Sequence, residues 1–411
     1  MTGTVIAVFA ATYVGMALGR VPGLKLDRTG IALMAVAVLL ATGAVDLDRM
    51  GASIDAPTIV LLFALMILSA QFAAAGFYDL CAGAITRATA TPERLLALTV
   101  AISGVLSAVL ANDVVVYAMT PLLCAGIGAR GLDPRPFLLA LAGASNAGSA
   151  ATLIGNPQNI LIGQLGGLDF WRFLAVCGPP ALLSVLVVYL VVRWVWRREL
   201  AAPAKAPPPP PDRTPVDGWQ VAKGAIATVL LIALFATPVP REIGALAIAA
   251  ALLASRKLAS RAMIGAVDWH LLLLFACLFT VTGAFAETGL AADGLDWLAR
   301  RGLLPDSLAV LAPLALVASN GIGNVPAVIL LMAIWPDPSE GALYGLALLS
   351  TLAGNLLLVG SLANVIVAER AAAAGLRLGF ADFARSGIPM TLLSMAIAVA
   401  WLALGGWMPW F

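Results

Sequence analysis

Residues 146–163, NAGSAATLIGNPQNILIG, and residues 354–371, GNLLLVGSLANVIVAERA, decide the fold of this 411-residue chain. Each segment interrupts a long apolar stretch with the pattern G-[NS]-x-x-N, which begins at Gly155 in the first segment and at Gly360 in the second. Because the same pattern recurs with the same internal spacing, the sequence indicates two related halves.

A second pair of motifs precedes these segments. Ser107 is followed five residues later by Asn112 in SAVLAND, and Ser319 is followed at the same distance by Asn324 in SNGIGN. The order of the two motifs is the same in each half, which strengthens the case for an internal repeat.

The composition indicates a membrane protein. Hydrophobic residues make up 61% of the chain, charged residues only 11%, and the mean hydropathy is +0.98, whereas a soluble domain has about 25% charged residues. A net charge of +2 is too small to indicate a nucleic-acid partner. Four scattered cysteines and a single histidine form no metal-binding or disulfide pattern, so we expect neither a metal site nor a cofactor.

A membrane-spanning helix needs about 20 mainly apolar residues. The sequence predicts ten spans, near residues 2–19, 29–45, 57–77, 136–162, 172–194, 219–237, 239–255, 268–288, 341–366 and 386–408. Two further apolar stretches, 95–129 and 307–335, are each interrupted in the middle by polar residues.

The basic residues predict the orientation in the membrane. Nineteen of the 24 Lys and Arg residues fall in loops on one side of the predicted spans, and the other side carries only Arg49, Arg172, Arg241, Arg300 and Arg301. Cytoplasmic loops carry the excess of Lys and Arg. We therefore expect a multi-pass protein of the cell's inner (plasma) membrane with both termini outside the cytoplasm.

The segment 200–217, LAAPAKAPPPPPDRTPVD, contains five consecutive prolines and predicts an extended cytoplasmic linker. It divides the chain into a first membrane repeat at 1–199, with a hairpin near 95–129, and a second at 218–411, with a hairpin near 307–335. On the predicted topology the first hairpin starts and ends in the cytoplasm and the second starts and ends outside. The two repeats would therefore be inverted, and in such folds substrate binds at the repeat interface.

The predicted fold class is thus an all-α polytopic membrane protein with two inverted repeats, about ten transmembrane helices and two re-entrant hairpins with broken helices. Charge bias alone does not distinguish hairpins from twelve complete spans. The breaks have a physical basis, because Pro157 lacks an amide hydrogen and Gly155-Asn156-Pro157 cannot continue a regular helix. Broken helices at membrane depth expose amide and carbonyl ends that attract anions and cations.

The motifs ANDVVVYAMTP, NAGSAATLIGNPQNILIG, SNGIGNVPAVILL and GNLLLVGSLANVIVAERA together resemble those of the ion-transporter superfamily, which includes arsenite permeases, citrate and dicarboxylate transporters, and sodium/proton antiporters. The resemblance implies transport by movement of a substrate-bearing domain, often in a homodimer. Carried onto this chain, it predicts a substrate or ion site formed by Asn112, Asp113, Thr152, Gly155, Asn156, Pro157, Asn159, Asn324, Pro326, Gly360, Ser361 and Asn364.

The hairpin tips depart from one branch of that superfamily. Dicarboxylate members carry Ser-Asn-Thr at both tips, whereas this chain has Ala111-Asn112-Asp113 and Gly323-Asn324-Val325. The tips look closer to the arsenite-permease side and to an uncharacterised anion-permease branch. In addition, no Lys or Arg occurs in 95–129, 136–171 or 302–369. This absence favours a small, weakly charged or neutral substrate. The predicted function is an ion-coupled secondary transporter, working by alternating access, of a small inorganic or organic anion or of a weakly charged oxyacid such as arsenite.

Asp113 is the acidic residue that lies well inside an apolar stretch, and intramembrane acids are usually functional. Our hypothesis is that it binds the coupling ion, H⁺ or Na⁺; the alternative is a buried carboxyl with a structural role. Ser145, Asn146, Ser149 and Thr351 are interpreted as contacts between helices, and His270 beside Asp268 as an interfacial pair.

Three other functions stay open on the sequence. A citrate or dicarboxylate transporter, a sodium/proton antiporter and an anion channel would all share the fold. An intramembrane enzyme needs a nucleophile with a base or clustered metal ligands, and the sequence offers no such catalytic residues. The predicted partners are a small-molecule or ion substrate and the lipid bilayer.

Overall fold

The computed structural model describes residues 2–18, 24–88, 91–207 and 216–411, and its regular structure in these residues is entirely helical. Six of the described helices are at least 18 residues long and apolar enough to cross a membrane. They are α4 (Ala56–Ala74), α6 (Pro92–Val109), α7 (Asn112–Ala129), α10 (Phe170–Val195), α15 (Trp269–Ala286) and α21 (Phe380–Leu404). The predicted all-helical, polytopic fold class is confirmed.

Shorter helices occupy four further predicted spans: α1 (Thr2–Leu18), α2 (Arg28–Ala41), α12 (Gly218–Leu234) and α13 (Arg241–Leu253). The predicted span 57–77 ends early, at Ala74. Gly76 adopts φ +75°, a left-handed conformation that glycine tolerates. This turn redirects the chain into α5 (Phe77–Thr86), a helix that the sequence did not predict.

The two remaining predicted spans are broken helices. The first consists of α8 (Arg135–Ser149) and α9 (Pro157–Leu165), and the second of α19 (Glu340–Ala353), the 3₁₀ turn η1 (Leu358–Gly360) and α20 (Leu362–Ala373). Pro157 stands in the first turn of α9, where a missing amide hydrogen costs nothing. Asn156 caps the same helix, because its Oδ1 accepts a hydrogen bond from the amide of Asn159 at 2.9 Å.

The two interrupted stretches form helical hairpins, α6 with α7, and α17 (Leu308–Ile322) with α18 (Asn324–Ile334). The first arm of each hairpin packs on the broken helix of its own half: α6 on α8, and α17 on α19. The second arm packs on the broken helix of the other half: α7 on α20, and α18 on α9. The two halves are therefore interleaved.

Both hairpin tips are buried inside the protein. Leu110 and Asn112 are 3% exposed and Asn324 is 5% exposed. A loop between two complete spans would emerge into water, so this burial favours hairpins, the alternative that charge bias did not resolve.

Six aspartates begin helices. In each case a carboxylate oxygen accepts a hydrogen bond from a backbone amide of the first turn, which satisfies a group that the helix leaves unpaired. The capping residues are Asp27, Asp46, Asp55, Asp169, Asp217 and Asp268. Six of the 22 acidic residues of the chain thus have a local structural role.

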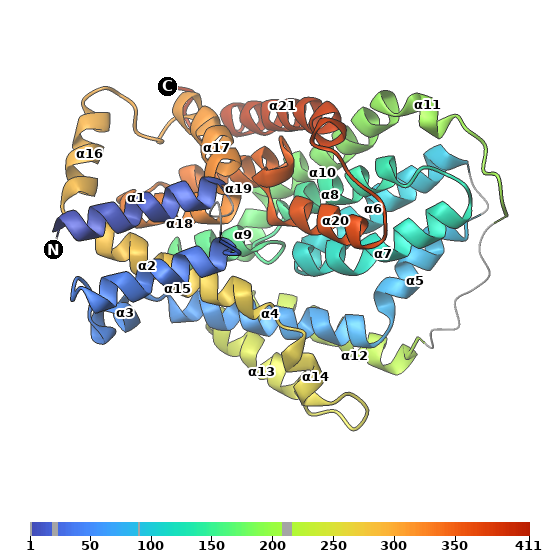
Figure 1. The fold of residues 1–411 in the computed structure, drawn as a ribbon, viewed down its shortest axis with the longest axis horizontal. Helices are drawn as coiled ribbons and strands as arrows, with labels where there is room; N and C mark the ends of the chain where they lie inside the picture. The colour runs from blue at the N-terminus through green and yellow to red at the C-terminus, as the bar shows by residue number, and fades with distance from the viewer. Residues whose placement is uncertain (1, 19–23, 89–90, 208–215) are drawn as a thin grey trace.

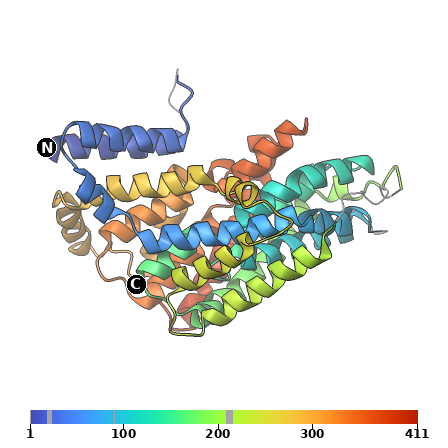
Figure 2. The same ribbon diagram turned by 90° about the horizontal axis from the view of Figure 1, so that it is seen from below.

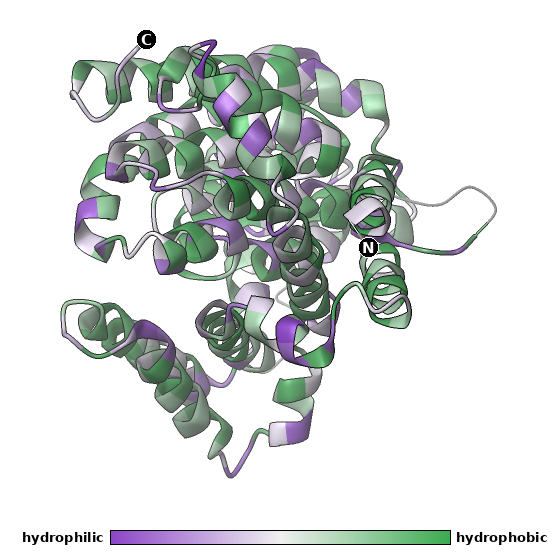
Figure 3. Ribbon diagram, turned by 90° about the vertical axis from the view of Figure 1, so that its left-hand side faces the viewer, coloured by the Kyte–Doolittle hydropathy of each residue, from purple (hydrophilic) through white to green (hydrophobic). Residues whose placement is uncertain are grey.

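Most helices run along the long axis of the molecule, with both termini towards one end and α5 and α11 (Arg197–Leu200) towards the other (Figure 1). Figure 2 shows α1 and α2 as an outlying pair on one side. In Figure 3 most of the helical ribbon is coloured as hydrophobic, with hydrophilic residues in short scattered segments. Within the predicted linker, 208–215 lie outside the described residues, and Lys205 N donates to Arg130 O at 2.9 Å.

Three further short helices connect longer helices along the chain. They are α3 (Leu47–Ser53), α14 (Ser260–Gly265) and α16 (Leu290–Ala299). The predicted amphipathic segment 289–301 contains α16, which buries none of its residues and runs across the direction of its neighbours in Figure 1. This position suits a helix that lies along a membrane interface.

Candidate substrate-binding site

The fully buried side chain of Asn146 joins the two broken helices. Its Nδ2 donates to Asn355 Oδ1 at 2.8 Å and to Asn364 Oδ1 at 3.0 Å. Its Oδ1 accepts from Asn112 Nδ2 at 3.3 Å and from Ser361 Oγ at 3.0 Å. One side chain at the end of α8 thus contacts the first hairpin tip and both sides of the break in the second half.

Thr351 makes the matching contacts from the second half. Its Oγ1 accepts from Asn156 Nδ2 at 3.4 Å and from Gln158 Nε2 at 3.1 Å, and it donates to Asn159 Oδ1 at 3.4 Å. Two partners of Thr351 are repeat counterparts of partners of Asn146: Asn156 corresponds to Ser361 and Asn159 to Asn364, just as Asn146 corresponds to Thr351. Each pair of counterparts is separated by the same number of residues.

The two motif asparagines bind their own breaks in the same way. Asn159 Nδ2 donates to the carbonyls of Ser149 and Thr152, ten and seven residues upstream. Asn364 Nδ2 also donates to carbonyls ten and seven residues upstream. Carbonyl groups that a broken helix would leave unpaired are satisfied in this way, as a buried break requires.

The first hairpin tip is held against the first break. Asn112 N donates to Gly155 O at 3.1 Å, and Thr152 Oγ1 donates to Ala108 O at 2.5 Å. A Cβ at Gly155 would overlap Ser149 O, so this position requires glycine. Asn112 Oδ1 is buried and has no hydrogen-bond partner in the part of the chain that the structure describes. It is a free acceptor at the tip, suited to a cation or to a donor group of a solute.

The second hairpin turns at Gly323, whose φ of +95° and ψ of 149° are accessible to glycine and costly for other residues. Asn324 Oδ1 accepts from Val325 N at 2.9 Å. The guanidinium of Arg28 lies over this turn, 3.1 Å from where a Cβ of Gly323 would be. Within the described residues this guanidinium has no hydrogen bond or ion pair.

A cavity of about 560 Å³ lies beside the first tip. Asp113 and Tyr117 of α7 line it, together with Asn156 and Pro157 at the start of α9. Residues of α4 form an apolar wall. The volume suits a small ligand.

A second cavity, of about 320 Å³, lies beside the second tip. Its lining includes Gly323, Asn324 and Pro326 from the hairpin, Arg28 from α2, and Glu369 from α20. The start of α15 lines both cavities, through its capping residue Asp268 and through His270 and Leu271. Thus the N-terminus of α15 stands where the two cavities approach one another.

The structure places the predicted site residues in three groups. One group meets in the polar network around Asn146 and Thr351: Asn112, Asn156, Asn159, Ser361 and Asn364. A second group shapes the breaks: Thr152, Gly155 and Gly360. A third lines the cavities: Asp113 and Pro157 in the first, Asn324 and Pro326 in the second.

Sequence reasoning did not include five residues that the geometry brings to this region. Asn146 and Thr351 were interpreted as ordinary helix contacts, yet they link the halves. Their equivalent positions in the repeat were a usable signal. Arg28, Asp268 and His270 come from predicted span ends far from the motifs, and only the tertiary fold shows that they line the cavities. No Lys or Arg of the hairpins or broken helices is among the residues that line the two cavities, but Arg28 of α2 supplies a fixed cation to the second cavity.

The fold and the paired cavities define a class of protein, a multi-pass membrane transporter. The sequence profile of the citrate transporter family (CitMHS) matches residues 13–342, and the chain belongs to this family. The predicted membership of the ion-transporter superfamily is confirmed.

Individual proteins agree with this assignment. The chain is 30% identical to a 46 kDa membrane protein of Mycobacterium leprae, over 98% of this chain and 99% of the relative. It is 26% identical to the silicon efflux transporter LSI3 of Oryza sativa subsp. japonica, over 92% and 93%. The YdaH transporter of Alcanivorax borkumensis, described as having an unusual topology, shares the fold at a TM-score of 0.61 and 15% identity, with 98% and 96% of the chains covered. These relatives are transporters or membrane proteins.

Proposed function

We propose that this protein is an ion-coupled secondary transporter of a small, weakly charged or neutral oxyacid or a small anion. The observation that carries the proposal is the pair of cavities at the two hairpin tips, lined on one side by the same three residues of α15. Such a pair suits a solute that is passed between two faces of the membrane.

The charge of the cavities supports the choice of substrate. The second cavity contains one arginine and one histidine but three carboxylates, Asp27, Asp268 and Glu369. The first cavity contains Asp113, Asp268 and His270 and no Lys or Arg. A multiply charged anion would be repelled by these carboxylates, whereas a hydroxylated solute with little charge can bind amide, hydroxyl and carboxylate groups. The silicon efflux relative is consistent with this chemistry.

A citrate or dicarboxylate transporter is the second candidate, because the family profile is described as that of a citrate transporter. Arg28 favours this second candidate, because a guanidinium binds a carboxylate through two parallel hydrogen bonds. The carboxylates around it and the absence of Ser-Asn-Thr at both tips favour the weakly charged solute.

We also propose alternating access between two inverted repeats, with the hairpins and broken helices as the moving unit. Two symmetric conformations of one site require equivalent contacts from both halves. The contacts of Asn146 and Thr351 are of this kind, and so is the packing of α7 and α18 on the opposite half. Asp113 would carry the coupling ion, because it lies in the first cavity next to the free acceptor Asn112 Oδ1.

The test is flux into proteoliposomes that contain the purified protein. Arsenite, silicic acid, phosphate, sulfate, citrate and succinate would each be offered with and without a Na⁺ or pH gradient. We expect saturable uptake of a weakly charged oxyacid that follows one gradient and shows counterflow. Gradient-driven citrate or succinate uptake would replace the proposed substrate class with the second candidate. Conductance that does not saturate would indicate a channel.

A further inference from the structure

A basic pocket lies at the end of the molecule opposite to the chain termini, where α10, α11 and α21 meet. Its volume is about 420 Å³, and its lining consists of Trp194, Val195, Arg197, Arg198 and Arg385. Three of the five lining residues are therefore arginines, and none is acidic. The carboxylates of this region do not enter the pocket.

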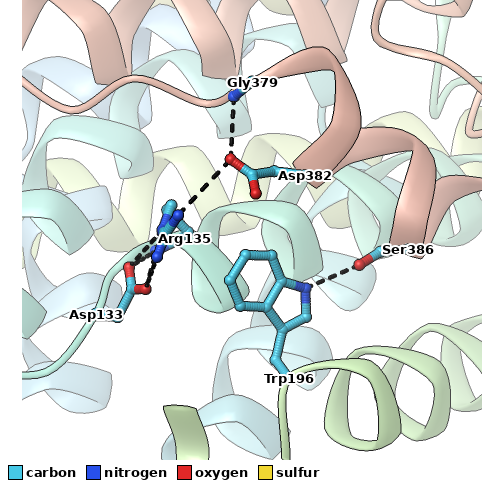
Figure 4. A network of polar contacts seen from close by, with 6 residues as sticks. All are labelled: Asp133, Arg135, Trp196, Gly379, Asp382 and Ser386. Carbon is cyan, nitrogen blue, oxygen red and sulfur yellow. Dashed lines mark hydrogen bonds and ion pairs between the residues drawn. The ribbon is translucent and has the colours of Figure 1, made fainter. Parts of the chain in front are cut away.

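Neighbouring arginines are paired with acids, whereas these three are not. Arg135 binds Asp133 at 2.7 Å and Asp382 at 3.8 Å (Figure 4), and Arg193 binds Glu93 at 3.1 Å. In the described part of the chain the three pocket arginines form no ion pair, and Arg385 donates only to the carbonyl of Val195, at 2.6 Å. Three cationic groups thus converge without a protein anion to neutralise them.

Buried contacts beside the pocket join α10 to α21. Trp196 is 1% exposed, and its Nε1 donates to Ser386 Oγ at 2.9 Å, which fixes the end of α10 to α21 (Figure 4). The guanidinium carbons of Arg135 and Arg385 lie 5.2 and 5.4 Å from the centre of this ring. Trp196 thus anchors the segment from which Arg197 and Arg198 extend.

An apolar stripe leads along the lipid-facing side of α10 to the pocket. Leu182, Leu186 and Leu190 are 72%, 50% and 50% exposed, and Trp194, which lines the pocket, is 65% exposed. Residues four apart lie on one face of a helix, so these side chains form a continuous row. The row of apolar side chains ends at the arginines. In a lipid, the apolar acyl chains likewise lead to a charged headgroup.

We propose that this pocket binds the phosphodiester headgroup of an anionic glycerophospholipid, with the acyl chains along the α10 stripe. Basic pockets between membrane helices on the cytoplasmic side recognise such headgroups, and arginine matches phosphate oxygens with two parallel hydrogen bonds. The apolar stripe favours a lipid over free phosphate, because free phosphate would gain no binding free energy from contact with the exposed leucines. The inference does not depend on the identity of the transported solute.

The test uses the purified full-length protein and native mass spectrometry with phosphatidylglycerol. A pocket variant, Arg197→Gln/Arg198→Gln/Arg385→Gln, is compared with a control, Arg256→Gln/Arg261→Gln/Arg377→Gln, which removes the same charge from exposed residues outside the pocket. We expect the pocket variant to retain at least tenfold less phosphatidylglycerol than the wild type, with the control close to the wild type. The single variant Arg198→Gln should show an intermediate loss of bound phosphatidylglycerol. This variant tests the proposal even if the triple variant does not fold.

Three further results decide the proposal. Phosphatidylcholine should neither bind at this pocket nor displace phosphatidylglycerol, and millimolar inorganic phosphate should not displace it. Equal retention by the pocket variant and the control would overturn the proposal. Displacement by inorganic phosphate, independent of acyl chains, would show a free-anion site instead.

Discussion

At the scale of single residues, the first cavity brings together an acid and an unsatisfied amide oxygen. Asp113 lines the cavity, and the adjacent Asn112 presents a buried Oδ1 that no described group binds. Oxygen ligands of this kind suit Na⁺, and a carboxylate can alternatively accept a proton. This arrangement is the basis for the proposed role of Asp113 in ion coupling.

Asp113→Asn tests that role. The amide keeps the shape of the side chain but neither carries a negative charge nor titrates, so we expect gradient-driven transport to fall at least tenfold while exchange without a gradient persists. Flux in proteoliposomes with and without an imposed gradient measures this. Asp293→Asn, on the exposed helix α16, is the control. Undiminished gradient-driven flux in Asp113→Asn would remove Asp113 from the coupling mechanism.

Arg28 is the fixed cation of the second cavity, and its removal tests whether the solute meets it. A hydrogen bond to a charged group contributes about 1.5–3 kcal/mol, so Arg28→Gln should raise the KM for an anionic solute by roughly tenfold to a hundredfold. Lys25→Gln, three residues earlier and exposed, should leave KM unchanged. For a neutral solute Arg28→Gln should change KM only slightly. Comparing an anionic with a neutral solute therefore reports which charge state is transported.

The sequence located the motif residues well but not their neighbours from other elements. The repeat identified Asn112, Asn159 and Asn364 because their spacing is local and therefore visible in one dimension. Arg28 and His270 reach the cavities only because α2 packs on α15 and α15 packs on α18. No periodicity in a single sequence encodes such a contact.

At the scale of elements, the broken helices depend on close approach of backbones. A Cβ at Gly155 would overlap Ser149 O, and one at Gly360 would overlap Asn320 Oδ1. Likewise a Cβ at Gly148 would overlap the backbone of Gly104, where α6 crosses α8. Small residues at such crossings permit tight packing of membrane helices.

Gly155→Ala should therefore disrupt the first break. Because the overlapping atoms belong to backbone, they have little freedom to move, and we expect a loss of thermal stability of several degrees together with loss of transport. Gly128→Ala is the matched control, because nothing lies within 4 Å of the added methyl group. Thermal denaturation in detergent measures both. A Gly155→Ala variant as stable and active as the control would contradict the observed packing.

Asn146→Ala removes the side chain that joins the halves. The variant leaves several buried polar groups unpaired, each at a cost of about 1–3 kcal/mol. Thr42→Ala, which deletes an exposed hydroxyl bound to its own helix, should change stability by less than about 0.5 kcal/mol. Equilibrium unfolding in denaturant compares the two. Similar stabilities would show that the Asn146 network is not needed to hold the halves together.

The elements that were predicted correctly carry long apolar runs, or breaks with proline and glycine. The hairpins and broken helices belong to this group. Helix α5 was not predicted because Gly76 turns the chain inside what reads as one apolar run. Its helical residues, with Asp79 among them, are too few to stand out as a span of their own.

At the scale of the whole molecule, the distribution of basic residues gives an orientation that can be tested directly. Both termini should lie outside the cytoplasm, because the loops rich in Lys and Arg lie at the opposite side of the predicted spans. Alkaline phosphatase fused after Phe411 should be active in cells, and green fluorescent protein fused there should be dark. The reverse pattern would invert the topology and place the basic pocket at the outer face.

The exchanged packing of the hairpins also bears on how the protein is made. While the ribosome has completed only the first half, α7 has no α20 to lie on, and α9 has no α18. The first hairpin must then wait in the bilayer with the face of α7 that meets α20 uncovered until translation of the second half is finished. Two half-chains produced from separate genes should consequently depend on each other for survival against membrane proteases. The two halves of this transporter would thus mature together.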